Sequence, residues 1–150
     1  MGTGIEVISA ALIATFIAQL LKFVFYYNKF KTVNFKIFAS TGGMPSSHSA
    51  AVVSTMTSVG LIMGFDSVEF SISLVFGLIV MYDAAGLRRS AGQMAAQLNM
   101  LVDSIYEQRP HNFRNKMKEL LGHTPFEVSM GALLGIAMSI LVHYYQLLFL

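Results

Sequence analysis

Four long apolar stretches, separated by shorter polar segments, dominate the pattern of this chain. A helix that crosses a bilayer needs about 20 consecutive and mainly apolar residues. The first stretch reaches this length if Lys22 extends its charge to the interface or faces the protein interior. The helices are expected at about residues 5–27, 46–65, 67–107 and 125–149. The pattern therefore predicts an all-α, polytopic membrane protein with four transmembrane helices.

The later stretches differ in the kind of helix that they predict. Residues 49–65 are uncharged and rich in small and hydroxyl side chains, which let membrane helices approach closely, so this helix is expected at the centre of the bundle. The third helix becomes amphipathic after Ser90 and is expected to leave the bilayer as a cytoplasmic extension, with a bend at Gly86 or Gly92. The spacing of Gly131 and Gly135 indicates a helix-packing face, which we interpret as a homodimer contact.

Composition supports the membrane class and bounds the size. Hydrophobic residues make up 55% of the 150 residues and charged residues 12%, which is unusual for a soluble protein. The length is that of one domain, 1–150. The chain has no cysteine, so disulfides and thiol chemistry are excluded. The N-terminus lacks the basic region of a signal peptide, so the first apolar stretch is expected to remain in the mature protein. No nucleic-acid partner is expected.

All ten basic residues lie in two segments of the chain. Four of them lie from Lys22 to the start of the second helix, and six lie from Arg88 to the start of the fourth helix. The basic residues are Lys22, Lys29, Lys31, Lys36, Arg88, Arg89, Arg109, Arg114, Lys116 and Lys118. Because cytoplasmic loops carry an excess of lysine and arginine, both segments are expected on the cytoplasmic side of the inner (plasma) membrane, with both termini outside. A short basic helix is expected at about 113–121, and the outer residue His143 is expected at the membrane interface.

Three pairs of residues have the spacing of a capping box, in which a first-turn carboxylate helps to begin a helix. The pairs are Thr3 with Glu6, Asp66 with Glu69, and Thr124 with Glu127. Glu127 also lies four residues after His123, where a carboxylate can orient an imidazole ring. Capping and ring orientation are both open for Glu127, and they do not exclude each other.

A glycine-rich turn with Gly42 and Gly43 runs into the start of the second helix at Pro45, with Ser46 or Met44 as its cap. A helix N-terminus with glycines before it is suited to binding an anion, and His48 can carry a proton near neutral pH. The segment therefore favours a site that holds and protonates a phosphate. The alternative is a capped helix whose histidine fills a polar gap.

Other charged and polar residues are expected at the same cytoplasmic level. The cations Lys22, Arg88 and Arg89 can bind phosphate oxygens there, although flanking cations also serve as topology anchors. Asp83 is an ionisable group at the membrane edge and is either a functional residue or the salt-bridge partner of one of the arginines. Gln93 can line a headgroup pocket or another helix.

Two motifs resemble the phosphatidic acid phosphatase type 2 superfamily, which includes the vanadium haloperoxidases. Pro45-Ser46-Ser47-His48 is similar to its P-S-G-H motif. The segment from Gly122 to Glu127 is similar to its H-x3-D motif, with glutamate in place of aspartate. Together with residues 42–50, 81–95 and 121–128, these motifs resemble the divergent branch of the superfamily, which consists of small bacterial membrane proteins with four helices.

The resemblance implies hydrolysis of a phosphate monoester or pyrophosphate of a lipid, without a metal ion or other cofactor. His123 would attack phosphorus to form a phosphohistidine, Glu127 would orient it, and His48 would protonate the leaving oxygen. Phosphate-binding groups would be Lys22, Gly43, Ser46, Ser47, Arg88 and Arg89, with Asp83 and Gln93 in support.

The chain also departs from the superfamily pattern. Of the K-x6-R-P motif only Lys22 and Lys29 have the right spacing, and Met117 stands where the arginine of S-R-x5-H belongs, so that Lys116, Lys118, Arg88 or Arg89 would replace it. The alternatives to a phosphatase are a non-catalytic protein that binds or transports a lipid phosphate at the same anion site, and a structural membrane protein whose motifs are caps and anchors.

Overall fold

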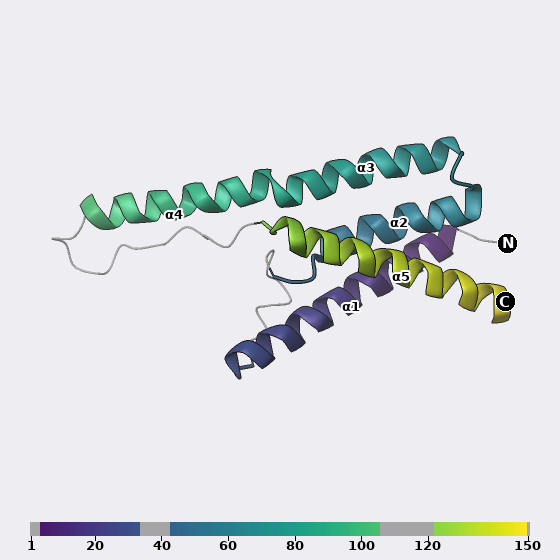
Figure 1. The fold of residues 1–150 in the computed structure, drawn as a ribbon, viewed down its shortest axis with the longest axis horizontal. Coiled ribbons are helices and arrows are strands. Elements are labelled where there is room, and N and C mark those ends of the chain that lie inside the picture. The colour runs from purple at the N-terminus through teal and green to yellow at the C-terminus, as the bar shows by residue number, and fades with distance from the viewer. Residues whose placement is uncertain (1–3, 34–42, 106–121, 150) are drawn as a thin grey trace.

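A computed structural model describes residues 4–33, 43–105 and 122–149 of the chain (Figure 1). Its helices are α1 (Gly4–Phe30), α2 (Ser47–Met63), α3 (Val68–Ala85), α4 (Leu87–Ile105) and α5 (Pro125–Phe149). The described residues contain no β-strand. The predicted all-α class is confirmed, and each of the four apolar stretches forms a helix. The basic helix expected at 113–121 lies outside the described residues.

Three helical segments are long and apolar enough to cross a membrane: Gly4–Phe30, Val68–Val102 and Pro125–Phe149. The remaining apolar helix, α2, has 17 residues, which is at the lower limit of about 17–25 residues for a spanning helix. It contacts α1, α3 and α5, so the small-residue helix takes the central position that its composition predicts. The first residues of α1 and the last residues of α5 lie at the same end of the bundle (Figure 1).

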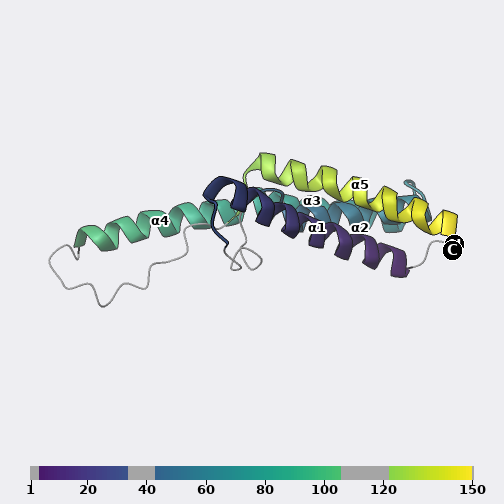
Figure 2. The same ribbon diagram turned by 90° about the horizontal axis from the view of Figure 1, so that it is seen from below.

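The third predicted helix is divided at Gly86, and α4 continues almost in line with α3 (Figures 1 and 2). Backbone hydrogen bonds cross the break, from Gly86 N to Tyr82 O at 2.8 Å and from Ser90 N to Gly86 O at 2.9 Å. These bonds keep the two helices close to one axis. Among the helices, α4 contacts only α3, and it extends well beyond the rest of the bundle.

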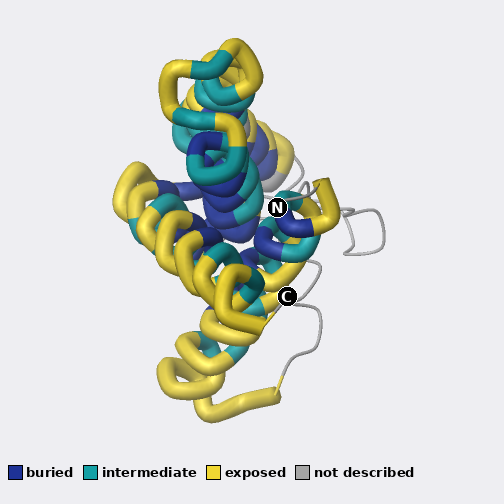
Figure 3. The backbone as a smooth tube through the Cα atoms, turned by 90° about the vertical axis from the view of Figure 1, so that its right-hand side faces the viewer, coloured by how far each residue is buried: buried dark blue, intermediate teal, exposed yellow. Residues whose placement is uncertain are grey.

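Small residues fill the interior, whereas many large apolar residues are exposed. Figure 3 shows the buried positions of the backbone on the inner sides of the helices. Ala14, Ala18 and Ala50 are completely buried, and Leu134 and Met138 pack against them. Large residues on the outer faces, such as Phe16 and Leu133, are more than half exposed. This distribution fits a protein surrounded by lipid, in which helices approach through small residues and bulky side chains contact hydrocarbon.

Gly131 and Gly135 form the contact between α5 and α2 within one chain. A Cβ at Gly135 would lie 2.6 Å from the carbonyl oxygen of Ala50, and a Cβ at Gly131 would collide with the carbonyl oxygen of Ser46. Our interpretation of these glycines as a homodimer contact is therefore wrong, because α2 occupies this face of α5. The sequence shows that a helix approaches closely but does not show which helix.

One stripe of α1 faces the interior with charged residues at both ends. The buried residues of this helix are four apart: Glu6, Ala10, Ala14, Ala18 and Lys22. At the terminal end of the bundle, Glu6 Oε1 lies 2.6 Å from Nδ1 of His143 on α5. His143 is therefore a partner of a buried carboxylate, a role that the sequence did not predict, and its position at the membrane interface stays a prediction.

The structure bears on two of the predicted helix caps. The carboxylate of Glu6 binds His143, and its predicted cap partner Thr3 lies outside the described residues, so the first predicted cap stays a prediction. The cap of α3 is Ser67 and not Asp66, since the Ser67 hydroxyl accepts a hydrogen bond from Phe70 N at 3.1 Å. The one-residue shift arises because Asp66 belongs to the preceding turn.

Candidate active site

Two helices begin side by side at the candidate site. Ser46 caps α2, because its hydroxyl accepts a hydrogen bond from Ser49 N at 3.3 Å and from the Ser49 hydroxyl at 3.0 Å. The backbone N–H of Ser46 donates to the carbonyl oxygen of Glu127, in the first turn of α5, at 3.1 Å. The N-termini of α2 and α5 are thus held together, and both direct the positive end of a helix dipole to the same region.

A third helix end joins them through His123. The backbone N–H of His123 donates to the carbonyl oxygen of Ala84, in the last turn of α3, at 2.9 Å. His123 is only 2% exposed. The site therefore contains the beginnings of two helices and the end of a third, and this convergence of distant segments places one histidine in the interior.

The imidazole of His123 is oriented by Glu127. Nδ1 of His123 lies 3.1 Å from Oε2 of Glu127. The same carboxylate oxygen accepts a hydrogen bond from Thr124 N at 3.1 Å, and Glu127 N donates to the Thr124 hydroxyl at 3.3 Å. The two roles considered for Glu127 are both present, because it caps α5 and orients the ring.

This arrangement leaves one nitrogen of the ring available. With a proton on Nδ1 directed to the carboxylate, Nε2 carries the lone pair, and among the described residues it has no hydrogen-bond partner. Burial lowers the pKa of His123, which favours the neutral ring, and the nearby charge of Lys22 acts in the same direction. Glu127 and the Gly43 carbonyl oppose this effect. A neutral ring with an unshared Nε2 lone pair is the nucleophilic form of histidine.

His48 lies next to His123. It occupies the first turn of α2, is exposed, and its ring centroid is 6.3 Å from that of His123, with the two planes at 63°. The two rings are therefore close enough to contact the same small group. The predicted pairing of the two histidines is consistent with this geometry.

Lys22 lies inside the same cluster. It is buried, and its aliphatic chain packs against Gly43, where an added Cβ would lie 3.3 Å from the Lys22 Cγ. Gly43 has a positive φ of 96°, so a side chain would be disfavoured there by both conformation and space. The charge of Lys22 acts on both His123 and Glu127. A cation thus lies beside the imidazole–carboxylate pair.

The other predicted residues have different positions. Ser46 contributes as a cap, and the Ser47 hydroxyl accepts a hydrogen bond from Gln19 Nε2 at 3.3 Å, a partner on α1 that sequence reasoning missed. Asp83 is half-buried, next to the residue that binds His123 N. Gln93 is exposed on α4, nine residues after Ala84 and therefore roughly 13 Å further along the helix axis, away from the histidines. The side chains of Arg88 and Arg89 lie outside the described part of the chain.

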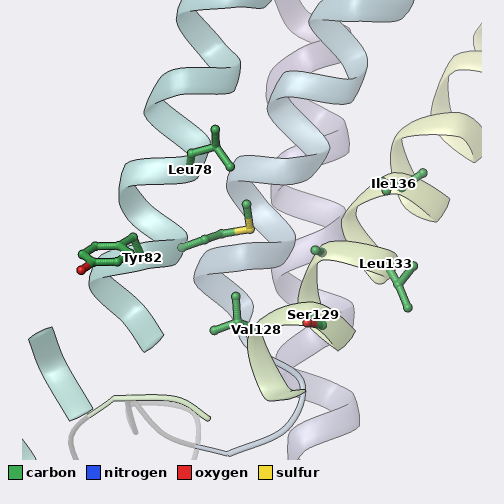
Figure 4. Close-up of a pocket in the computed structure, with 8 residues that line it drawn as sticks. Leu78, Tyr82, Val128, Ser129, Leu133 and Ile136 are labelled. Atoms are coloured by element: carbon green, nitrogen blue, oxygen red, sulfur yellow. The ribbon is translucent and has the colours of Figure 1, made fainter. Parts of the chain in front are cut away.

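An apolar groove lies between α3 and α5 (Figure 4). It has a volume of about 640 Å³ and is open to the surface. It is lined by Leu78, Met81, Tyr82, Val128, Ser129, Ala132, Leu133 and Ile136. One end begins at Val128, the residue after Glu127, and the groove then follows both helices toward the middle of the bundle.

The fold and the sequence pattern define an integral membrane protein with a polar cluster where two helices begin and a third ends. A sequence model of the Divergent PAP2 family matches residues 4–138, and the chain belongs to that family. It is 38% identical to the uncharacterized membrane protein YuiD of Bacillus subtilis (strain 168), with 91% of this chain and 92% of the relative covered. No solved structure matches significantly. The resemblance to the divergent branch of the superfamily is confirmed.

Proposed function

We propose that the protein is a membrane phosphatase that hydrolyses a phosphate monoester or pyrophosphate of a lipid through a phosphohistidine intermediate. The observation that carries this proposal is the state of His123: it is buried, its Nδ1 is bound to Glu127, and its Nε2 has no partner among the described residues. Family membership supports the proposal at the level of the superfamily.

The first chemical step uses the lone pair on Nε2 of His123. Nε2 attacks phosphorus, a P–N bond forms, and the P–O bond to the leaving alcohol or phosphate breaks. The ring becomes positively charged during this step, and the carboxylate of Glu127 at Nδ1 stabilises that charge. His48 donates a proton to the leaving oxygen.

The second step reverses the role of His48. Having lost its proton, His48 accepts one from a water molecule that attacks phosphorus, the P–N bond breaks, and inorganic phosphate leaves. His48 suits this role because it is exposed and therefore accessible to water, whereas the buried His123 is not. The difference in burial supports His123 as the nucleophile and His48 as the acid–base group.

Charge stabilisation comes from groups that surround the cluster. The charge of Lys22 acts on His123, and α2 begins next to His48, so both the ammonium and the helix N-terminus favour the negative charge of a phosphoryl group. Arg88 and Arg89, at the start of α4, remain proposed phosphate ligands. By the positive-inside rule, we place this end of the bundle at the cytoplasmic face of the plasma membrane.

The apolar groove favours a lipid over a water-soluble phosphate ester. It begins beside Glu127 and is lined almost entirely by apolar side chains of two membrane helices. A substrate with its phosphate at His123 can therefore place a hydrocarbon chain along α3 and α5 without exposing it to water.

A second candidate is a protein that binds or carries a lipid phosphate without hydrolysis. The observation that favours it is Met117 at the position where the superfamily has an arginine, because methionine cannot form charge-assisted hydrogen bonds with phosphate. Under this alternative the anion site and groove are used, but no P–N bond forms.

The deciding experiment measures phosphate release from lipid monophosphates and lipid pyrophosphates by the purified full-length protein without added metal. The matched variant is His123→Asn, which keeps a polar side chain. We expect release by the native chain, loss of at least about 10³-fold in the variant, and a labelled, acid-labile and base-stable phosphoryl group on the native chain only. Lipid phosphate that binds both proteins equally, with no release by either, would establish the carrier.

A further inference from the structure

Helix α4 has an exposed apolar stripe that the candidate site does not use. The stripe consists of Ala91, Met94, Leu98 and Leu101. All four residues are exposed, with Met94 at 62%, Leu98 at 47% and Leu101 at 55%. Ala95 and Asn99, on the adjacent face, are buried. Helix α4 therefore has a covered face and a separate apolar face that is exposed.

The spacing of the stripe is that of a coiled coil. Its residues are separated by three, four and three positions. In the sequence, Leu87 lies four residues before the stripe and Ile105 lies four residues after it, so both continue the same spacing. Apolar residues that alternate at three and four positions lie along one line of a helix and favour packing against a second helix with the same repeat.

The surroundings of the stripe are compatible with a second copy of the same helix. Residues 90–102 include no acidic or basic side chain, so two identical helices can align in register without repulsion between like charges. Two copies in one membrane also have the same orientation, which makes their α4 helices parallel and places them on the same side. Other helices do not block this approach, because among them α4 contacts only α3 (Figure 2).

We propose that the Ala91, Met94, Leu98 and Leu101 stripe of α4 pairs with the same stripe of a second copy, forming a parallel two-stranded coiled coil outside the bilayer. The helix has 19 residues, so the interface is smaller than the roughly 800 Å² per partner of a typical stable complex. Confinement of both copies to one membrane raises their effective concentration, and a short seam is then sufficient. This inference does not depend on the proposed phosphatase activity.

Because the chain has no cysteine, single cysteines can test the proposal directly. The seam variant is Leu98→Cys and the matched control is Met100→Cys, which is also exposed but lies about 160° around the helix from Leu98. Both are made in the full-length protein, reconstituted in vesicles at a low protein-to-lipid ratio and oxidised. We expect a disulfide-linked species at twice the 16.5 kDa chain mass for Leu98→Cys and at least tenfold less for Met100→Cys.

A second measurement separates a specific pair from random collision. Energy transfer between differently labelled copies of the native chain is expected to disappear in Leu98→Asp, whose helix content is checked by circular dichroism. Equal crosslinking at both positions, or none at either, would overturn the proposal. So would strong quenching of a Leu98→Cys label by quenchers in the lipid headgroups, because that result would show α4 lying on the membrane surface.

Discussion

Two histidine–glutamate pairs lie at opposite ends of the bundle and differ in almost everything except their chemistry. His123 and Glu127 are four residues apart at the start of α5, with 3.1 Å between the bonded atoms. His143 and Glu6 are 137 residues apart and join α5 to α1, with 2.6 Å between them. The histidines are 20 residues apart on or next to α5, which is about 30 Å along the helix axis.

The surroundings decide what each pair can do. His123 lies beside a second histidine, a lysine and two helix N-termini, and its Nε2 has no partner among the described residues. The pair of His143 and Glu6 lies at the terminal end of the bundle and connects two helices. We therefore interpret the first pair as chemical and the second as structural. The same residue types can serve either role, and only the neighbours distinguish them.

The largest expected difference is in turnover. Glu127→Gln keeps a side chain that can cap α5 but removes the negative charge at Nδ1 of His123, so we expect phosphate release to fall about 10²- to 10⁴-fold. Glu6→Gln, the matched change at the other end, should leave turnover per folded molecule unchanged. Release assays normalised to folded protein provide the comparison, and an equal loss in both variants would show that the two pairs do not differ in role.

The next effect is on stability. His143→Leu leaves the buried carboxylate of Glu6 without its partner, and we expect the free energy of unfolding to fall by about 3 kcal/mol. Adding Glu6→Leu to this variant should restore most of the loss, because the unpaired charge is then removed as well. Unfolding in detergent micelles measures both variants. If His143→Leu has native stability, the pair does not hold α1 to α5.

A smaller effect separates the two glycines of α5. Gly131→Ala and Gly135→Ala each push α5 away from α2, and each should cost about 1–3 kcal/mol of stability. Only Gly131→Ala displaces Ser46, whose N–H is bonded to Glu127, so only this variant should also lose turnover at temperatures where it is folded. Equal activity of the two folded variants would show that the Ser46–Glu127 contact does not position the site.

The smallest effect is on pH dependence. Burial lowers the pKa of His123 below 6.5, so the neutral nucleophile persists below that pH, and kcat/KM should fall only as the pH passes below the lowered value. Between the lowered pKa and 6.5 the unfolded chain binds more protons, so the contribution of His123 to stability is complete above 6.5 and is lost as the pH falls. In Glu127→Gln, which lacks the charge that raises this pKa, the acidic limb should move to still lower pH. A limb that moves upward in this variant would contradict the assignment.

Much of the fold could be predicted because it depends on local composition. Apolar length predicts the helices, and the small residues of 49–65 predict that α2 is central. The break at Gly86 is one of the two positions that the sequence allowed. What local pattern does not specify is the partner of each face, and for this reason Gly131 and Gly135 were expected at a contact between chains.

The candidate site shows the same division. The contact between His123 and Glu127 follows from a spacing of four, and the capping box at Thr124 follows from a spacing of three. The pair of Glu6 and His143 has no local spacing, and neither does the hydrogen bond from Gln19 to Ser47. The sequence nevertheless indicates that Glu6 is buried. It begins a four-residue repeat that continues through three alanines and ends at Lys22, so all five residues share one face of α1.

That repeat has a consequence for the position of α1 along its own axis. A helix with only alanines on its inner stripe could slide by one turn, about 5.4 Å, and present nearly the same surface to α2. Glu6 and Lys22 lie at the ends of the stripe, so such a shift would bring a charge into the space now occupied by Ala10 or Ala18. Both alanines are completely buried, and a charge there would lose its contact with water. The two charged residues therefore define the register of α1 along its axis against α2 and α5, and the three alanines between them define only how closely it approaches its neighbours.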